Sequence, residues 1–407
     1  MRHKKITAVA ALSVGALMLS ACGKGASSDS IAGVTDDTIT LGSLLDLGGP
    51  FAATGKDVLA GTEIAVSEIN EAGGICERDV ELLNKDHGYD TQRGVVAYDE
   101  AEPKVAMFLH LMGSALTAAI ADKVVDDEIL AMPTSYSSAL LGSDNFVILG
   151  ATYDVGSINA IDWMTTEKLI AEGDTIGEIY LEGEWGESAH QGVEYAADQL
   201  GLKVASHQIK VTDADFASQI SDLKSQGVSA IMIAGTGTQV ATVAALAESN
   251  GLDVPIMGNG PTWNTGMLET SSRDALVKNF HRPWISYSLD DQAPKSTELT
   301  KQWQAAHEGE KPSSGSGISA GYAAVYAAKA VLEQTCDDLS RPAILKARGQ
   351  VEPFDVEGLF PPLDIRDSSK PSSIEMVIET VDPAAPDGMK STDLFSSDLA
   401  KEYVDTL

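Results

Sequence analysis

The alternation of apolar and amphipathic segments constrains the fold of this chain more than any other feature. Runs such as "TITLGSLL" (38–45) and "VAMFLHLM" (105–112) are almost entirely apolar, which is typical of strands buried on both faces of a sheet. Segments with helical spacing of apolar residues lie between such runs, for example 55–74, where Gly73 and Gly74 end the pattern. This alternation predicts parallel sheets that are covered by helices on both faces.

The alternation occurs in two successive series. Strands are expected in the first series at 38–45, 80–86, 105–112, 129–132 and 145–151, and in the second at 175–182, 203–210, 228–235 and 253–259. Two such series within 407 residues predict an α/β protein that consists of two doubly wound parallel-sheet lobes.

The last third of the chain is less regular, and we expect it to complete both lobes. A long helix is predicted at 319–335 and a late strand at 374–380, with a connector rich in proline and glycine between them. The predicted division is 37–152 plus about 286–355 for lobe 1, and 153–285 plus about 356–395 for lobe 2.

Residues 1–21 have the pattern of an export signal peptide. The basic "MRHKK" precedes the apolar "ITAVAALSVGALML", and small residues follow. Residues 19–22, "LSAC", resemble the lipobox of bacterial lipoproteins, in which the cysteine becomes the first residue and carries a diacylglycerol. We therefore expect lipidation at Cys22 and a flexible tether over 22–36. The predicted location is outside the cell, anchored by lipid to the outer face of the bacterial cell membrane.

The charge balance argues against one class of partner. The chain has 60 acidic and 28 basic side chains, a formal charge of -32. Such a surface repels phosphate backbones, so nucleic-acid binding is not expected.

Motifs of enzymes and cofactor-binding proteins occur only in incomplete form. "GISAG" (317–321) matches a nucleophile elbow in letters, but no strand precedes it, so Ser319 is not expected to be a nucleophile. "AGTGTQVA" has Val240 where a dinucleotide fingerprint needs a third glycine. The histidines show no spacing typical of metal ligands. We expect no catalytic activity, no cofactor and no metal.

Polar or glycine-rich loops follow most of the predicted strands. They are 48–57, 112–117 and 133–140 in the first series, and 182–188, 235–239 and 259–264 in the second. Ligands of open α/β sheets lie beyond the carboxyl ends of the strands, where helix N-termini favour anions. Two such edges that face each other would form a ligand-binding cleft.

The stretch "ITLGSLLDLGGPFAATGKDVLAGTEIAVSEINEAGGI", the loops "MGSALT" and "PTSYSSAL", and the later "EGEWGES" together resemble a known family. They look like the branched-chain amino acid-type (leucine/isoleucine/valine-binding) substrate-binding proteins of ABC importers. The resemblance implies a periplasmic-binding-protein-like type I fold, in which a three-strand hinge joins two lobes that close on the ligand. It also implies a monomer that binds a small molecule and delivers it to permease subunits.

The resemblance places a ligand carboxylate in the first lobe. Family members hold it with the serine that opens the helix after the third strand, which matches Ser114, and with the next loop, which matches Ser135, Tyr136 and Ser137. A carboxylate at Ser114 would gain a charge-assisted hydrogen bond and the free N–H groups of a helix N-terminus. The alternative is that Ser114 only caps its helix.

Other contacts are implied in the second lobe and in the first loop. An aromatic residue commonly covers the ligand at the position of Trp185. Thr236 and Asn259, in the next two loops of that lobe, are further candidate contacts, as is Phe51 in the first loop of lobe 1. Amino-acid binders carry an acid for the ligand ammonium in the loop that matches 259–264, and none is present here. Asp154 could supply that acid or could only cap its helix.

Cys76 and Cys336 remain once Cys22 is set aside. An exported chain meets oxidising surroundings, so a disulfide between them is expected, with two buried free thiols as the alternative. The resemblance places both cysteines in lobe 1, where a link would leave the hinge free.

The sequence thus predicts a lipid-anchored solute-binding component of an ABC importer for a branched-chain amino acid or a related carboxylate. Two alternatives stay open. The ligand could be an aromatic carboxylate or a small amide or urea, or the protein could report ligand to a receptor instead of a permease.

Overall fold

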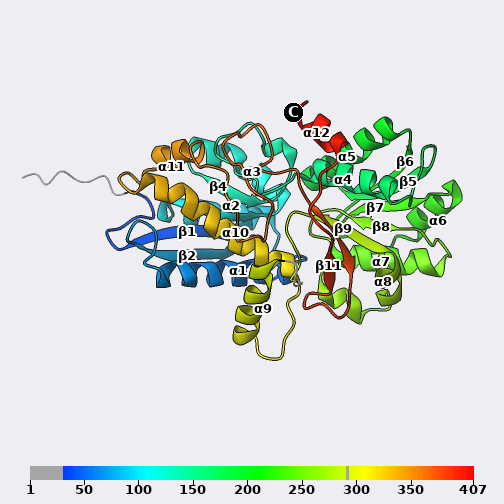
Figure 1. Ribbon diagram of the computed structural model, residues 1–407, viewed down its shortest axis with the longest axis horizontal. Helices are drawn as coiled ribbons and strands as arrows, with labels where there is room; N and C mark the ends of the chain where they lie inside the picture. The colour runs from blue at the N-terminus through cyan, green and yellow to red at the C-terminus, as the bar shows by residue number, and fades with distance from the viewer. Residues whose placement is uncertain (1–30, 290–292) are drawn as a thin grey trace, which may run out of the picture. The chain divides into compact units, whose positions relative to one another are not determined.

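The computed structural model describes residues 31–289 and 293–407, and the signal segment and Cys22 lie outside these ranges. Two separate sheets organise the described chain, one of four strands in the order β2-β1-β3-β4 and one of seven in the order β11-β10-β9-β8-β7-β5-β6. Helices surround each of them (Figure 1). The expected α/β architecture with parallel sheets is therefore confirmed.

The first sheet is parallel throughout. Its strands are β1 (Thr38–Leu45), β2 (Asp79–Asp86), β3 (Met107–Met112) and β4 (Ala131–Thr134). The helices that accompany it are α1 (Ala52–Glu71), α2 (Thr91–Ala101), α3 (Ser114–Asp126), α9 (Pro294–Ala306), α10 (Gly315–Leu332) and α11 (Arg341–Arg348). All six positions of β3 are buried, as its continuous apolar sequence predicts.

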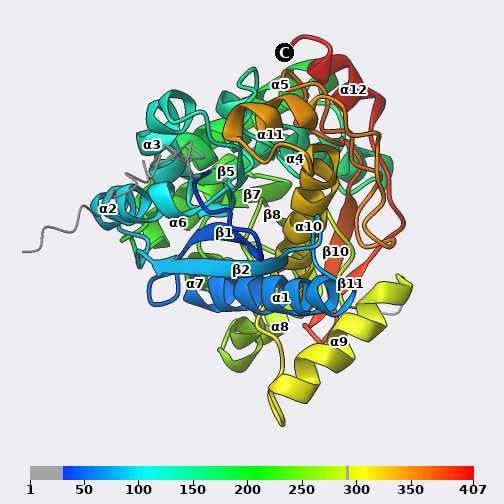
Figure 2. The same cartoon turned by 90° about the vertical axis from the view of Figure 1, so that its left-hand side faces the viewer.

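Helix α10 returns from the second half of the chain to lie beside α1 (Figure 2). Glycines permit this close approach. A Cβ atom on Gly61 would lie 2.0 Å from the carbonyl oxygen of Ile318, and one on Gly321 would lie 2.0 Å from that of Val58. Residues beyond Gly315 therefore complete the layer around the first sheet.

The second sheet is parallel from β6 to β9 and antiparallel at its far edge. Its strands are β5 (Thr175–Leu181), β6 (Lys203–Ile209), β7 (Ala230–Ala234), β8 (Ile256–Gly258), β9 (Phe280–Trp284), β10 (Val377–Val381) and β11 (Met389–Ser391). The helices are α4 (Tyr153–Thr166), α5 (Glu184–Leu200), α6 (Ala217–Gln226), α7 (Gly237–Ser249), α8 (Arg273–Asn279) and α12 (Asp398–Val404). The late segment that forms β10 and β11 adds two antiparallel strands beside β9.

The prediction of one strand is wrong. The segment 145–151 forms no ladder, and Phe146 makes only an isolated bridge with Ala131. Its apolar residues are nevertheless buried, because the segment leads inward from the first sheet toward α4. An apolar run of this length therefore indicated burial correctly but not sheet pairing.

Cys76 and Cys336 are joined by a disulfide with a Cα–Cα distance of 5.2 Å. Cys336 follows the end of α10, so the bond ties this returning helix to the turn before β2. Within 31–289 and 293–407, every helix is too short or too polar to cross a lipid bilayer.

Candidate functional site

The loops after β3 and β4 place two serine hydroxyls in direct contact. The Ser135 Oγ donates a hydrogen bond to the Ser114 Oγ at 2.7 Å, and both side chains are buried. Ser114 is the first residue of α3, and the N-cap is Gly113, whose φ of 107° suits glycine. The alternative in which Ser114 serves as the N-cap is therefore wrong, and its hydroxyl pairs with Ser135 instead.

Tyr153, the first residue of α4, brings a third hydroxyl to this pair. Its backbone N–H donates to the carbonyl oxygen of Tyr136 at 2.8 Å. Burial raises the pKa of Tyr153 to about 12, while the Tyr136 backbone and the hydroxyls of Ser114 and Ser135 act in the opposite direction. The Tyr153 side chain thus lies beside the serine pair.

Aromatic rings enclose this polar group, and we call them the aromatic cluster: Phe51, Tyr89, Tyr136, Tyr153, Trp185 and Trp284. The ring centroids of Tyr136 and Tyr153 are 5.7 Å apart, and those of Phe51 and Trp185 are 6.0 Å apart, both edge to face. Phe51 begins the first helix of the first sheet, whereas Trp185 lies in α5 beside the second. The cluster therefore bridges the two halves of the fold.

Asn259 holds Trp185 and the start of α4 together. Its Oδ1 accepts from the Trp185 Nε1 at 3.2 Å, while its Nδ2 donates to the Tyr153 carbonyl oxygen at 2.9 Å and to the Ser157 Oγ at 3.0 Å. These bonds occupy both ends of the amide. A Cβ atom on the neighbouring Gly260 would lie 2.8 Å from the Tyr153 ring, so only glycine fits there.

Two of the predicted site residues have local structural roles. The Thr236 hydroxyl accepts from the Gln239 N–H at 3.3 Å, and the Gln239 Oε1 accepts from the Thr236 N–H at 2.9 Å, which forms a capping box at the start of α7. Ser137 caps a short 3-10 helix by accepting from the Ala139 N–H at 3.3 Å. Both hydroxyls therefore accept hydrogen bonds from their own segments.

The carboxylates near the cluster are already paired. Asp154 accepts from Thr152, from the Val155 N–H at 2.8 Å and from the Tyr403 hydroxyl at 2.9 Å, and it is fully buried. Asp46 accepts from the backbone N–H groups of residues 48, 49 and 51. The oxygens of both carboxylates are thus occupied by hydrogen bonds from their own loops.

A small cavity lies at the base of the cluster. Its lining comes from the segments that pass between the two sheets, and comprises Tyr136, Ala151, Thr152, Tyr153, Gly156, Asn259, Gly260, Pro283, Trp284, Ile285 and Met376. The enclosed volume is about 10 Å³, which is near the lower limit for one water molecule. A solute can therefore enter only if these segments move apart.

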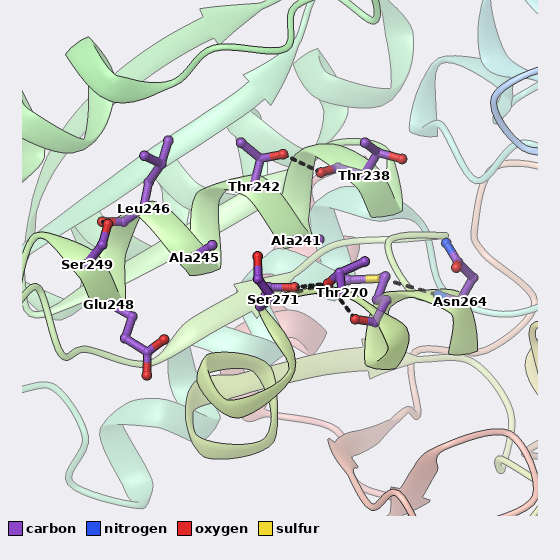
Figure 3. Close-up of a pocket in the computed structure, with 13 residues that line it drawn as sticks. Thr238, Ala241, Thr242, Ala245, Leu246, Glu248, Ser249, Asn264, Thr270 and Ser271 are labelled. Carbon is purple, nitrogen blue, oxygen red and sulfur yellow. Dashed lines mark hydrogen bonds between the residues drawn. The ribbon is translucent and has the colours of Figure 1, made fainter.

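A much larger groove of about 780 Å³ lies elsewhere, between α7 and the segment 264–272 (Figure 3). Several of its hydroxyls form hydrogen bonds within their own segments. The Thr242 Oγ1 donates to the Thr238 carbonyl oxygen at 2.8 Å, and the Thr270 Oγ1 donates to that of Met267 at 2.7 Å. The groove is the larger of the two candidate ligand sites, but polar groups converge only at the aromatic cluster, which we therefore favour as the binding site. In the part of the chain that the structure describes, no group of His, Cys, Asp and Glu side chains could hold a metal ion.

The structure brings the predicted residues Ser114, Ser135, Tyr136, Trp185 and Phe51 together, and it adds three aromatic residues that the sequence did not indicate. One of them, Tyr153, directly precedes Asp154 in the sequence. The other two are Trp284, the last residue of β9, and Tyr89, which lies in the loop after β2. An aromatic residue at the carboxyl end of a strand or at the start of α4 is the feature of the sequence that could have indicated these three positions.

The comparisons with known proteins agree with this geometry. A family model described as periplasmic binding protein matches residues 38–382. A leucine-, isoleucine-, valine-, threonine- and alanine-binding protein of Pseudomonas aeruginosa is 24% identical over 279 residues, which are 67% of this chain and 72% of that protein.

Solved structures of solute-binding proteins share the fold. A fatty acid ABC transporter substrate-binding protein from Thermomonospora curvata has a TM-score of 0.88 and 34% identity, over 92% of this chain and 96% of that one. A solute-binding protein of an R. palustris ABC transporter in complex with 4-hydroxybenzoate has a TM-score of 0.75 and 16% identity, over 89% and 98% of the two chains. The relatives and neighbours are solute-binding proteins and not enzymes.

Proposed function

This chain belongs to the periplasmic binding protein family, and on that premise we propose that it is the solute-binding component of an ABC importer for a carboxylate-bearing solute. The solute would lie between the loops of the two sheets, within the aromatic cluster. A branched-chain amino acid or a related carboxylate is the solute class that the sequence predicts.

The observation that carries the proposal is the buried contact of Ser114 and Ser135 at the start of α3. Two hydroxyls beside the free N–H groups of a helix N-terminus form an array of donors that suits a carboxylate. The Ser135 hydroxyl donates to Ser114 in the present structure. A solute carboxylate would accept from both hydroxyls once the cleft has opened to admit it and closed again.

The names of the similar proteins support a carboxylate. Leucine and its analogues, fatty acids and 4-hydroxybenzoate differ in their bodies but share this group. The Ser114–Ser135 pair would hold the shared part, and the aromatic cluster would contact the part that varies.

Closure would supply the signal for transport. Phe51 and Trp185 meet across the two halves of the fold, and the Ser138 Oγ lies 3.4 Å from the Ser188 Oγ of α5. A solute that contacts both halves binds the closed form better than the open one, which is the condition for a population shift. We place the hinge in the three segments that link the sheets, with the lobe boundaries given above as a prediction.

The proposal includes the location of the protein. Export by the signal segment and a lipid on Cys22 would hold a monomer at the outer face of the membrane, within reach of the permease subunits. Mass spectrometry of the membrane-bound protein should find a diacylglycerol-modified N-terminal Cys22, and an unmodified chain would contradict this part.

A thermal-shift screen tests the binding function. The protein without residues 1–21 would be heated with amino acids, fatty acids, aromatic acids and the corresponding amides. A solute at 100 times its dissociation constant adds about 2.7 kcal/mol to the free energy of unfolding. We expect carboxylates to raise the unfolding temperature and their amides to have a much smaller effect.

A further inference from the structure

Trp284 contributes an unused hydrogen-bond donor to the base of the cleft. Its side chain is 5% exposed and lines the small cavity together with Tyr136, whose ring is 6.0 Å away. Within the described residues its indole N–H has no acceptor. A buried donor without a partner is costly, and such groups in native proteins usually have a functional explanation.

The Arg282 guanidinium lies 4.6 Å from the centre of the Trp284 ring, and its charge is balanced by an ion pair with the buried Glu379. The Trp284 indole N–H therefore differs from the serine hydroxyls of the cluster, because Ser135 already donates to Ser114. Only an acceptor from outside the described residues can satisfy the indole N–H.

A carboxylate that could pair with a solute ammonium group is missing from the lining of the same cavity. None of the described residues that line the cavity carries a carboxylate. The carboxylates of Asp46 and Asp154 accept three hydrogen bonds each from their own surroundings, and the Asn259 Oδ1 accepts from Trp185. An ammonium group enclosed here would lose its water without gaining a partner.

We propose that the solute is a carboxylate with an apolar body and no ammonium group, and that the Trp284 indole N–H binds one of its oxygens. This inference rests on the proposed function and narrows its solute class. The carboxylate satisfies the donors, and the aromatic cluster covers an aliphatic or aromatic body. The same arrangement rejects α-amino acids, because the cleft would leave their ammonium group unpaired.

Matched pairs of solutes that differ only in the amino group test the class. Suitable pairs are leucine with 4-methylpentanoate, phenylalanine with 3-phenylpropanoate, and 2-aminooctanoate with octanoate, each measured by calorimetry on the whole protein without residues 1–21. We expect the acid without the amino group to bind at least tenfold more tightly in every pair that binds.

The outcomes separate the inference from the proposed function. If an amino acid binds as tightly as its partner, the inference is wrong and the carboxylate-binding function stands. If no member of any pair binds, both are wrong for carboxylates of this size.

The role of Trp284 is tested with Trp284→Phe, which keeps an aromatic ring and removes the N–H. We expect about tenfold weaker binding of the preferred acid and an unchanged or slightly higher unfolding temperature, because the N–H has no partner to lose. The matched control is Trp263→Phe, since the Trp263 Nε1 donates to the Asp387 carbonyl oxygen at 2.9 Å. This control should lower the unfolding temperature and keep the affinity.

A Trp284→Phe protein with wild-type affinity would show that the indole N–H does not bind the solute. A lower unfolding temperature with unchanged affinity would assign the residue a purely structural role. The comparison of solute pairs uses the wild-type protein, so it still decides the solute class if the variant does not fold.

Discussion

Ser114→Ala removes the hydroxyl on which the proposed carboxylate site depends most. A hydrogen bond to a charged group contributes about 1.5–3 kcal/mol, so the affinity for the preferred carboxylate should fall by roughly 10- to 150-fold. The substitution also removes the acceptor of the buried Ser135 hydroxyl, which donates to Ser114 at 2.7 Å. A buried hydroxyl that loses its acceptor costs about 1–3 kcal/mol, and a decrease of that size is expected in the free energy of unfolding without solute.

Calorimetry with the best carboxylate from the thermal-shift screen measures the affinity, and urea unfolding without solute measures the stability. Ser67→Ala is the matched control, because Ser67 is an exposed helical serine whose hydroxyl bonds only to Glu71. The double variant Ser114→Ala/Ser135→Ala should lose less affinity than the sum of the single variants, since the two hydroxyls act as a pair. If Ser114→Ala keeps its affinity within twofold, the carboxylate does not bind at this pair.

Three further predictions concern stability. Burial raises the pKa of Asp57 from 3.8 to about 7, so its protonated form stabilises the fold fully below about pH 4, and this contribution is lost as the pH rises to 7. The free energy of unfolding should therefore fall between pH 5 and 7.5, and Asp57→Asn should make this fall smaller by up to about 1.4 kcal/mol per pH unit. Identical pH profiles of the two proteins would contradict this. Replacing Cys76 and Cys336 by serine opens a loop of 260 residues, and the chain-entropy relation predicts that the free energy of unfolding falls by roughly 5–6 kcal/mol. Urea unfolding of this variant and of the oxidised wild-type protein measures the difference, and a value below 1 kcal/mol would refute the prediction. Thr236→Ala should lower the free energy of unfolding by about 1 kcal/mol, because α7 loses its N-terminal cap, and it should leave the solute affinity unchanged. Weaker binding would show that Thr236 contacts the solute.

The periodicity of the sequence was sufficient to predict most of the fold. Apolar runs of six to eight residues became β1, β3 and β5, because continuous burial on both faces is a strong local signal. The segment 145–151 carries the same signal, yet it pairs with no strand beyond one bridge. Whether a buried extended segment joins a sheet depends on its neighbours in space, which local composition does not contain.

The site was predictable where loops after neighbouring strands supplied its residues. Ser114 and Ser135 follow adjacent parallel strands, so strand order brings them together. The contribution of Tyr153 depends on how the chain enters α4, and that of Trp284 depends on where β9 ends relative to β4. Both depend on how the linking segments pass between the sheets, so the spacing of residues along the chain did not reveal them.

The central claim is that a carboxylate binds at the Ser114–Ser135 pair within the aromatic cluster. A crystal structure of the protein grown with its preferred carboxylate tests it most directly. We predict one carboxylate oxygen at about 2.5–2.7 Å from the Ser114 Oγ. A carboxylate in the groove beside α7, with the Ser135 hydroxyl still donating only to Ser114, would contradict the account.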